Sequence, residues 1–209
     1  MKSKSGIDIL VYFRSPADLE MYFRRCIEAH VRRNPMISSL SEQEIIDGAL
    51  PFNPLIIGPH PFAPSGMGLA TAVECGALTA QILEHIPILE TMNGAMSRQN
   101  NDRAAAWAAT FRKRISAGSD AHVPGCIGKL VTCAKLQPGE QFIDAIQRED
   151  AILCGSPPNH LLSALIFVLG QMKVCCRREG FRMFRELVRV YAGKGYYGRL
   201  RLPPSPAMS

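Results

Sequence analysis

Apolar residues along this chain alternate between short strand-like runs and longer helical patterns. The first run, Ile7–Phe13, is rich in β-branched and aromatic residues and predicts a strand. Ser15 and Pro16 then provide a helix cap and a first turn, and apolar residues recur at helical spacing as far as His30. His30 lies on the apolar side of this helix, so we expect it to be packed or partly buried in the core.

The alternation of strands and helices continues through the next hundred residues. A capping box at Ser41-Glu42-Gln43-Glu44 predicts the start of a second helix, and a short buried strand is predicted at Leu55–Ile57. The further elements predicted in order are a helix Ala70–Glu84, a strand Ile86–Met92, a helix Arg98–Arg114, strands Ile115–Ala117 and Leu130–Ala134, a helix Pro138–Arg148 and a strand Ala151–Cys154. This order is typical of a parallel α/β sheet or barrel.

The segment 58–68, G-P-H-P-F-A-P-S-G-M-G, is predicted to be a shaped loop. Its three prolines and three glycines exclude a helix or a central strand. It follows a buried strand directly, at the carboxyl end where α/β folds place their sites. His60 lies between two prolines that restrict its backbone, which suits a ligand better than a solvated surface residue.

A second candidate site segment is Gly118-Ser119-Asp120-Ala121-His122. Side chains two residues apart on a strand point the same way, so we expect Asp120 and His122 to face one pocket. A carboxylate and an imidazole there would suit a pair of metal ligands, or a general base with its orienting partner. The alternative is a turn in which Asp120 caps the following segment and His122 is solvated.

Glu90 is unusual because it lies within the apolar run Ile86–Met92. An unpaired carboxylate is costly to bury. Two interpretations remain open: Glu90 reaches the site, or it pairs with a cation.

The composition predicts a globular protein, with 47% apolar and 20% charged residues in 209. The seven cysteines are odd in number, form no C-x-x-C pair and follow no recognisable signal peptide. This usage predicts reduced thiols in the cytoplasm and disfavours a disulfide framework or a zinc knuckle. The longest apolar run, near Leu161–Leu169, is too short to span a bilayer.

The net charge of +6 is concentrated in the last part of the chain. Nine lysines and arginines lie between Lys173 and Arg201, against two glutamates. We predict that residues 159–209 form a basic helical tail with a Pro-rich end, and that His160 is a cap or surface residue. The basic helix either docks on its own domain with a solvated face, or binds nucleic acid or the surface of an anionic membrane.

Three segments together resemble the PHP family (polymerase and histidinol phosphatase domains): His60-Pro61-Phe62, Gly118–His122 and the strand ending Glu90–Gly94 between them. The likeness covers Ile7–Cys154. It implies a seven-stranded β/α barrel, (β/α)7, that holds divalent metal ions (Mn, Zn, Mg or Fe) and hydrolyses a small-molecule phosphate ester with metal-activated water. It also implies that His60, Asp120 and His122 are metal ligands, that Asp120 and His122 are catalytic, and that Glu90 lies at the edge of the site.

The chain departs from the family pattern because no two histidines are two residues apart, whereas the family barrel opens with H-x-H. Asp8 and Ile9 stand where many relatives carry a histidine. We therefore expect residues 1–158 to form an incomplete PHP-type barrel with Ile7–Phe13 near an exposed sheet edge, weak metal binding and little turnover. The chain is either a phosphoesterase completed by residues upstream of Met1, or an inactive binding module.

Overall fold

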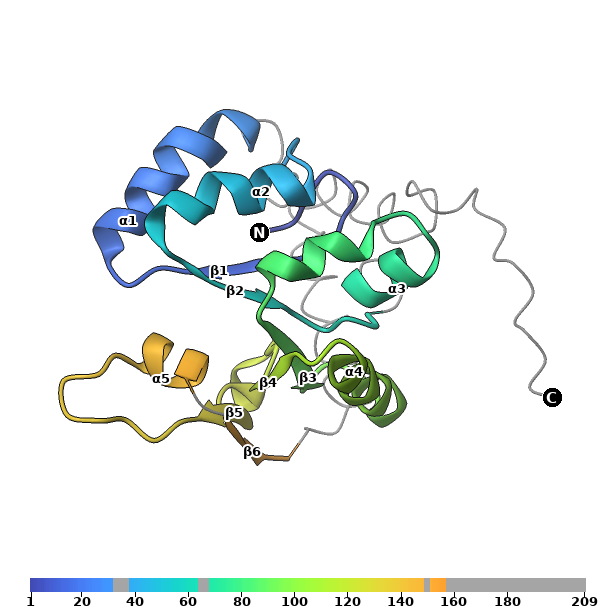
Figure 1. Cartoon of the computed structure of the whole chain (residues 1–209). Coiled ribbons are helices and arrows are strands. Elements are labelled where there is room, and N and C mark those ends of the chain that lie inside the picture. Colours follow the sequence, from blue (N-terminus) through green and yellow to red (C-terminus); the bar gives the residue numbers. More distant parts are fainter. Residues whose placement is uncertain (32–37, 64–67, 149–150, 157–209) are drawn as a thin grey trace, which may run out of the picture.

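The computed structural model describes residues 1–31, 38–63, 68–148 and 151–156 of the chain. Its main sheet has four strands in the order β1-β2-β3-β4, namely Leu10–Tyr12, Leu55–Gly58, Ile88–Asn93 and Arg114–Gly118. Two further strands, β5 (Leu130–Cys133) and β6 (Ile152–Gly155), form an antiparallel pair. The helices are α1 (Pro16–Tyr22), α2 (Glu42–Ala49), α3 (Leu69–Glu74), α4 (Arg98–Thr110) and α5 (Phe142–Arg148) (Figure 1).

The predicted α/β class is confirmed, since β2, β3 and β4 are parallel and connected by helices. The described strands form an open sheet and not a closed barrel, and β1 lies at one edge of it, as expected. The expectation of parallel strands throughout is wrong for β1, which runs antiparallel to β2, and for β5 and β6, which pair antiparallel with each other. Two helices, α1 and α2, separate β1 from β2, and the chain enters β2 at the end of the sheet where β1 finished. The predicted tail, including His160, lies outside the described residues.

The first helix begins as predicted, because the Ser15 side chain accepts a hydrogen bond from the Asp18 N–H. It does not continue regularly to residue 30. A π-helical turn at Phe23–Ile27 and a short 3-10 helix follow α1 and change the direction of the later side chains. His30 is exposed and lies 2.8 Å from the Ser39 hydroxyl, so the prediction that it is buried is wrong.

The predicted helix Ala70–Glu84 is divided in two. Gly76 has φ of +75°, a left-handed conformation that stops α3, and a 3-10 helix at Ala80–His85 follows. The predicted helix Arg98–Arg114 also ends early, because α4 stops at Thr110 and Arg112 has φ of +50°. Arg114 is already the first residue of β4.

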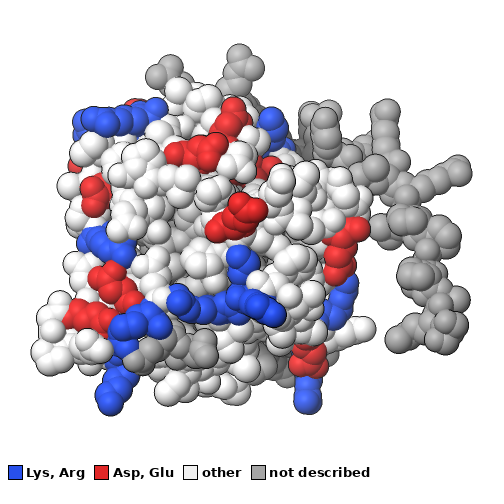
Figure 2. Space-filling model, viewed as in Figure 1, with Lys and Arg blue, Asp and Glu red and all other residues white. Residues whose placement is uncertain are grey.

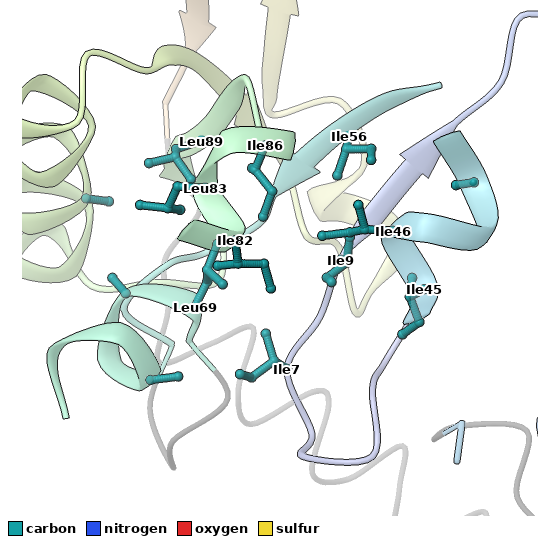
Figure 3. Packing of buried hydrophobic residues seen from close by; sticks show 14 of the residues in the cluster. Ile7, Ile9, Ile45, Ile46, Ile56, Leu69, Ile82, Leu83, Ile86 and Leu89 are labelled. Carbon is teal, nitrogen blue, oxygen red and sulfur yellow. The ribbon is translucent and has the colours of Figure 1, made fainter. Parts of the chain in front are cut away.

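The core lies mainly on one face of the sheet, where α1, α2, α3 and α4 pack. Ile9, just before β1, lies close to Ile46 of α2, and Leu89 of β3 faces the same core (Figure 3). On the opposite face Ile57 and Ile88 pack with Ile146 of α5. Burial on both faces explains why β2 is apolar at every position before Gly58.

Candidate functional site

The candidate site residues gather at one edge of the sheet. The carboxyl ends of the parallel strands β2, β3 and β4 lie there, and so does the amino end of the antiparallel strand β1. His60 follows β2, Glu90 and Asn93 lie on β3, Asp120 follows β4, and Asp8 precedes β1. In an open α/β sheet, this is the edge where ligands bind.

Glu90 is the buried centre of this group, with 6% of its surface exposed. Its Oε2 accepts a hydrogen bond from the backbone N–H of His60 (2.9 Å) and another from Nδ2 of Asn93 (2.7 Å). The register between β3 and β4 shifts between Glu90 and Met92, a bulge of the kind found beside functional sites. Of the two sequence-based interpretations, the geometry favours a Glu90 that reaches the site.

Burial raises the pKa of the Glu90 carboxyl, and the neighbouring charge of Asp120 acts in the same direction. The hydrogen bonds from Asn93 and the His60 backbone oppose this shift, as does the charge of His60. The shift remains upward, so an ionised Glu90 is costly here unless a cation compensates it.

His60 occupies a constrained position above Glu90. Its φ is +29°, which is rare for a residue with a side chain, and its N–H points to the Glu90 carboxylate. Nε2 of His60 lies 3.7 Å from Oδ2 of Asp8, and Asp8 also forms an ion pair with Lys2. Nδ1 of His60 is buried and has no hydrogen-bond partner among the described residues, which leaves a nitrogen lone pair or N–H to be satisfied.

The loop that carries His60 is fixed by aromatic packing. The ring of Phe62 meets the ring of Trp107 edge to face, with centroids 6.2 Å apart. The guanidinium of Arg103 lies over the Phe62 ring, 4.0 Å from its centroid. The α3 helix adds a hydrogen bond from the Ala70 N–H to the Pro61 carbonyl at 2.9 Å. These contacts hold Pro61 and Phe62, which follow His60, against α3 and α4.

Asp120 and His122 are arranged differently from the expectation. The strand ends at Gly118 and Asp120 has φ of +43°, so the alternation of an extended strand does not apply to these two residues. His122 is exposed, and its Nδ1 lies 2.9 Å from the backbone carbonyl of Asp120. The prediction that both side chains face one pocket because of strand alternation is therefore wrong.

The segment leading to Asp120 is held by two hydroxyl groups. Oγ1 of Thr132 on β5 accepts from the N–H of Ala117 and donates to its carbonyl, both at 2.8 Å. In return, the Ser119 hydroxyl donates to the Leu130 carbonyl (3.0 Å) and accepts from the Leu130 N–H (3.3 Å). Side-chain hydrogen bonds thus take the place of backbone pairing between β4 and β5. In this way β5 positions the segment Gly118–His122, the candidate loop.

Within the described ranges, no three His, Cys, Asp or Glu side chains are arranged to hold a metal ion. The structure brings His60 and Glu90 together, with Asp120 near Glu90, and leaves His122 at the surface. The nitrogen and oxygen donors nonetheless suit Mn, Fe, Zn or Mg, and the unsatisfied His60 nitrogen fits such an ion. Their assignment as ligands stays a prediction.

Lys2 and Asn93 belong to this group although no motif in the sequence marks them, and the sequence singles out Asp8 only as standing where many relatives carry a histidine. Asp8 stands between two fully buried residues, Ile7 and Ile9, so it was recognisable as the outward-facing member of an alternating pattern. Asn93 was recognisable as the last residue of β3 before a glycine. No local signal identifies Lys2, because its pairing with Asp8 depends on the folded amino-terminal segment.

On the face shown in Figure 2, acidic and basic side chains are interspersed. The basic tail lies outside the described residues, so its binding to nucleic acid or membrane stays a prediction. No helix in the described ranges has the length and hydropathy needed to cross a membrane.

An open α/β sheet with histidine and carboxylates at its carboxyl edge is the class of protein that these observations define. A family model described as PHP-associated matches residues 98–151, from the start of α4 past the end of α5. This segment contains Gly118–His122, and the likeness to the PHP family lies in the family's C-terminal part and not in the part that carries H-x-H. A comparison with curated proteins found no match, and neither did one with solved structures.

Proposed function

We propose that this chain is part of a metal-dependent phosphoesterase, incomplete or impaired as it stands. The single observation that carries the proposal is the buried Glu90 carboxylate, held between the His60 N–H and the Asn93 amide at the carboxyl edge of the sheet. A buried carboxylate with a raised pKa beside a second carboxylate is costly without a cation. The relation to the PHP family supports the same chemistry. In this proposal the open sheet is part of an incomplete β/α barrel.

Each residue has a distinct role in the proposed site. His60 contributes a ring nitrogen, Glu90 and Asp120 contribute carboxylate oxygens, and His122 joins them if its loop turns inward. A bound divalent ion would neutralise charge on the phosphoryl oxygens and activate water for hydrolysis. Asn93 keeps the Glu90 carboxylate oriented, and Gly118 leaves space for it.

Metal binding is the first test. The full chain is titrated with Mn²⁺ by calorimetry, alongside His60→Ala and a control, His30→Ala, which removes an exposed histidine outside the site. We expect weak binding that His60→Ala reduces by about tenfold or more and that His30→Ala leaves unchanged. Equal binding by all three proteins would refute the role of His60.

Hydrolysis of p-nitrophenyl phosphate with Mn²⁺, Zn²⁺ or Mg²⁺ is the second test. We expect little turnover from the chain alone, because losses in a cooperating site are strongly non-additive. A form extended upstream with an H-x-H segment should be active and should lose activity in Asp120→Asn and His122→Ala. Metal binding without turnover in every form would instead support an inactive binding module.

A further inference from the structure

Two cysteines on the β5–β6 pair form a second chemically distinct feature, independent of the proposed hydrolytic site. In the register of these strands Cys133 is opposite Ile152, and Cys154 is opposite Val131. The two cysteines are therefore diagonal neighbours on the same face of an antiparallel pair. Both are half-buried, and the interaction with Cys154 raises the pKa of the Cys133 thiol.

The other described cysteines have different surroundings. The Cys26 thiol donates to the Gly48 carbonyl, and the Cys75 thiol donates to the Ala72 carbonyl within α3. Cys126 is buried. Cys133 and Cys154 differ from these three because they lie on the same face of one strand pair.

We propose that Cys133 and Cys154 are a redox-active dithiol that closes to an intrachain disulfide by exchange with a small-molecule disulfide such as oxidised glutathione. Cys154, as thiolate, attacks one sulfur of that disulfide and expels a thiolate. Cys133 then gives up its proton and attacks the Cys154 sulfur of the mixed disulfide, which expels the second thiolate. Two protein thiols are oxidised and one small disulfide is reduced to two thiols.

The order of attack follows from the raised pKa of the Cys133 thiol, whose main cause is its interaction with Cys154, with burial second. A thiol with a raised pKa is the poorer first nucleophile, so Cys133 attacks second. Diagonal pairing requires the strands to adjust slightly, and β5 and β6 are short and paired only with each other.

The disulfide would act on a segment close to the candidate site. Cys133 follows Thr132, whose hydroxyl binds both backbone groups of Ala117. A crosslink between β5 and β6 therefore restrains the strand that positions the loop from Gly118 to His122. We expect slower amide hydrogen exchange, by several-fold, across β5 and β6 in the oxidised protein.

The test uses the full chain in buffers of increasing ratio of oxidised to reduced glutathione, followed by acid quench and trypsin. Cleavage after lysine and arginine places Cys133 in the peptide Leu130–Lys135 and Cys154 in the peptide Glu149–Lys173, each with a single cysteine. We expect these two peptides to become linked, with the loss of two hydrogens. Detection of only glutathione adducts on the separate peptides, at every ratio, would overturn the proposal.

Single substitutions give an independent readout. Cys133→Ser should trap glutathione on Cys154, whereas Cys154→Ser should leave Cys133 reacting about tenfold more slowly than Cys154 does. Cys75→Ser is the matched control and should leave the ratio for half-oxidation unchanged. If Cys75→Ser impairs disulfide formation as strongly as Cys133→Ser does, the assignment of the pair is also overturned.

Discussion

Gly118 of β4 leaves room for the Glu90 carboxylate, and no other residue would leave that room. A Cβ at position 118 would lie 2.2 Å from Oε1 of Glu90. The opposite oxygen, Oε2, is fixed by the hydrogen bonds from His60 and Asn93. The glycine in the sequence G-S-D-A-H therefore has a steric role in the site, separate from any role in the turn that follows it.

Gly118→Ala is expected to push Glu90 away from its two donors. Overpacking of this kind costs about 1–3 kcal/mol of unfolding free energy, and Mn²⁺ binding should weaken in parallel. Urea denaturation and calorimetry measure the two effects. Gly125→Ala is the control, because a Cβ there meets nothing within 4 Å. If Glu90→Ala does not relieve the destabilisation in the double variant, the clash is not with Glu90.

Glu90→Gln is expected to stabilise the metal-free protein at neutral pH. The pKa of Glu90 is raised in the folded state, mainly by burial. Its favourable contribution is complete below the unfolded-state pKa and is lost as the pH rises through the folded-state pKa. A glutamine keeps an acceptor for His60 and Asn93 and has no charge to bury.

Unfolding free energies of Glu90→Gln and the unmodified chain, measured from pH 4 to pH 8 with a chelator present, check this prediction. The difference should grow with pH and then level off, while Mn²⁺ binding by the variant should weaken. A constant difference across the pH range would mean that Glu90 does not titrate abnormally in the folded protein.

Thr132→Val is expected to destabilise the contact between β5 and the candidate loop. The substitution keeps the shape of the side chain but leaves the N–H and carbonyl of Ala117 without their hydroxyl partner. Such a loss costs about 1–3 kcal/mol. Thr132→Ser retains the hydroxyl and should recover most of the stability. Equal melting temperatures for the valine and serine variants would contradict the hydroxyl contact.

Ser41→Ala is expected to cost about 1 kcal/mol of unfolding free energy by removing the N-cap of α2. The Ser41 side chain accepts from the Glu44 N–H, and the Glu44 side chain accepts from the Ser41 N–H. Thr79→Ala is a suitable control, because Thr79 precedes a 3-10 helix without a side-chain cap. Denaturant midpoints of both variants are compared with that of the unmodified chain.

The features that were predicted correctly from the sequence depend on neighbours in the chain. Ser15 caps α1 and Ser41 caps α2 because a cap needs only the next three residues. The apolar run at Leu55–Ile57 became a strand because both faces of the sheet are covered. Local pattern therefore predicted where most strands lie.

The errors arose where one residue changed the direction of the backbone. A π-helical turn placed His30 in solvent, and the positive φ of Asp120 ended the alternation that was expected to continue to His122. Asp8 lies beside His60 because β1 runs antiparallel to β2. The start of β1 is therefore at the same edge of the sheet as the end of β2. Such long-range geometry leaves no trace in a single sequence.

The hydroxyl of Thr132 has a further consequence for the outer edge of β4. An exposed strand edge offers its N–H and carbonyl groups as a template for a strand of another molecule, which is how ordered aggregates grow. At Ala117 both groups are already bound by one side chain, without the addition of a strand. This position of the sheet is protected from intermolecular pairing while the loop beyond it keeps its irregular course.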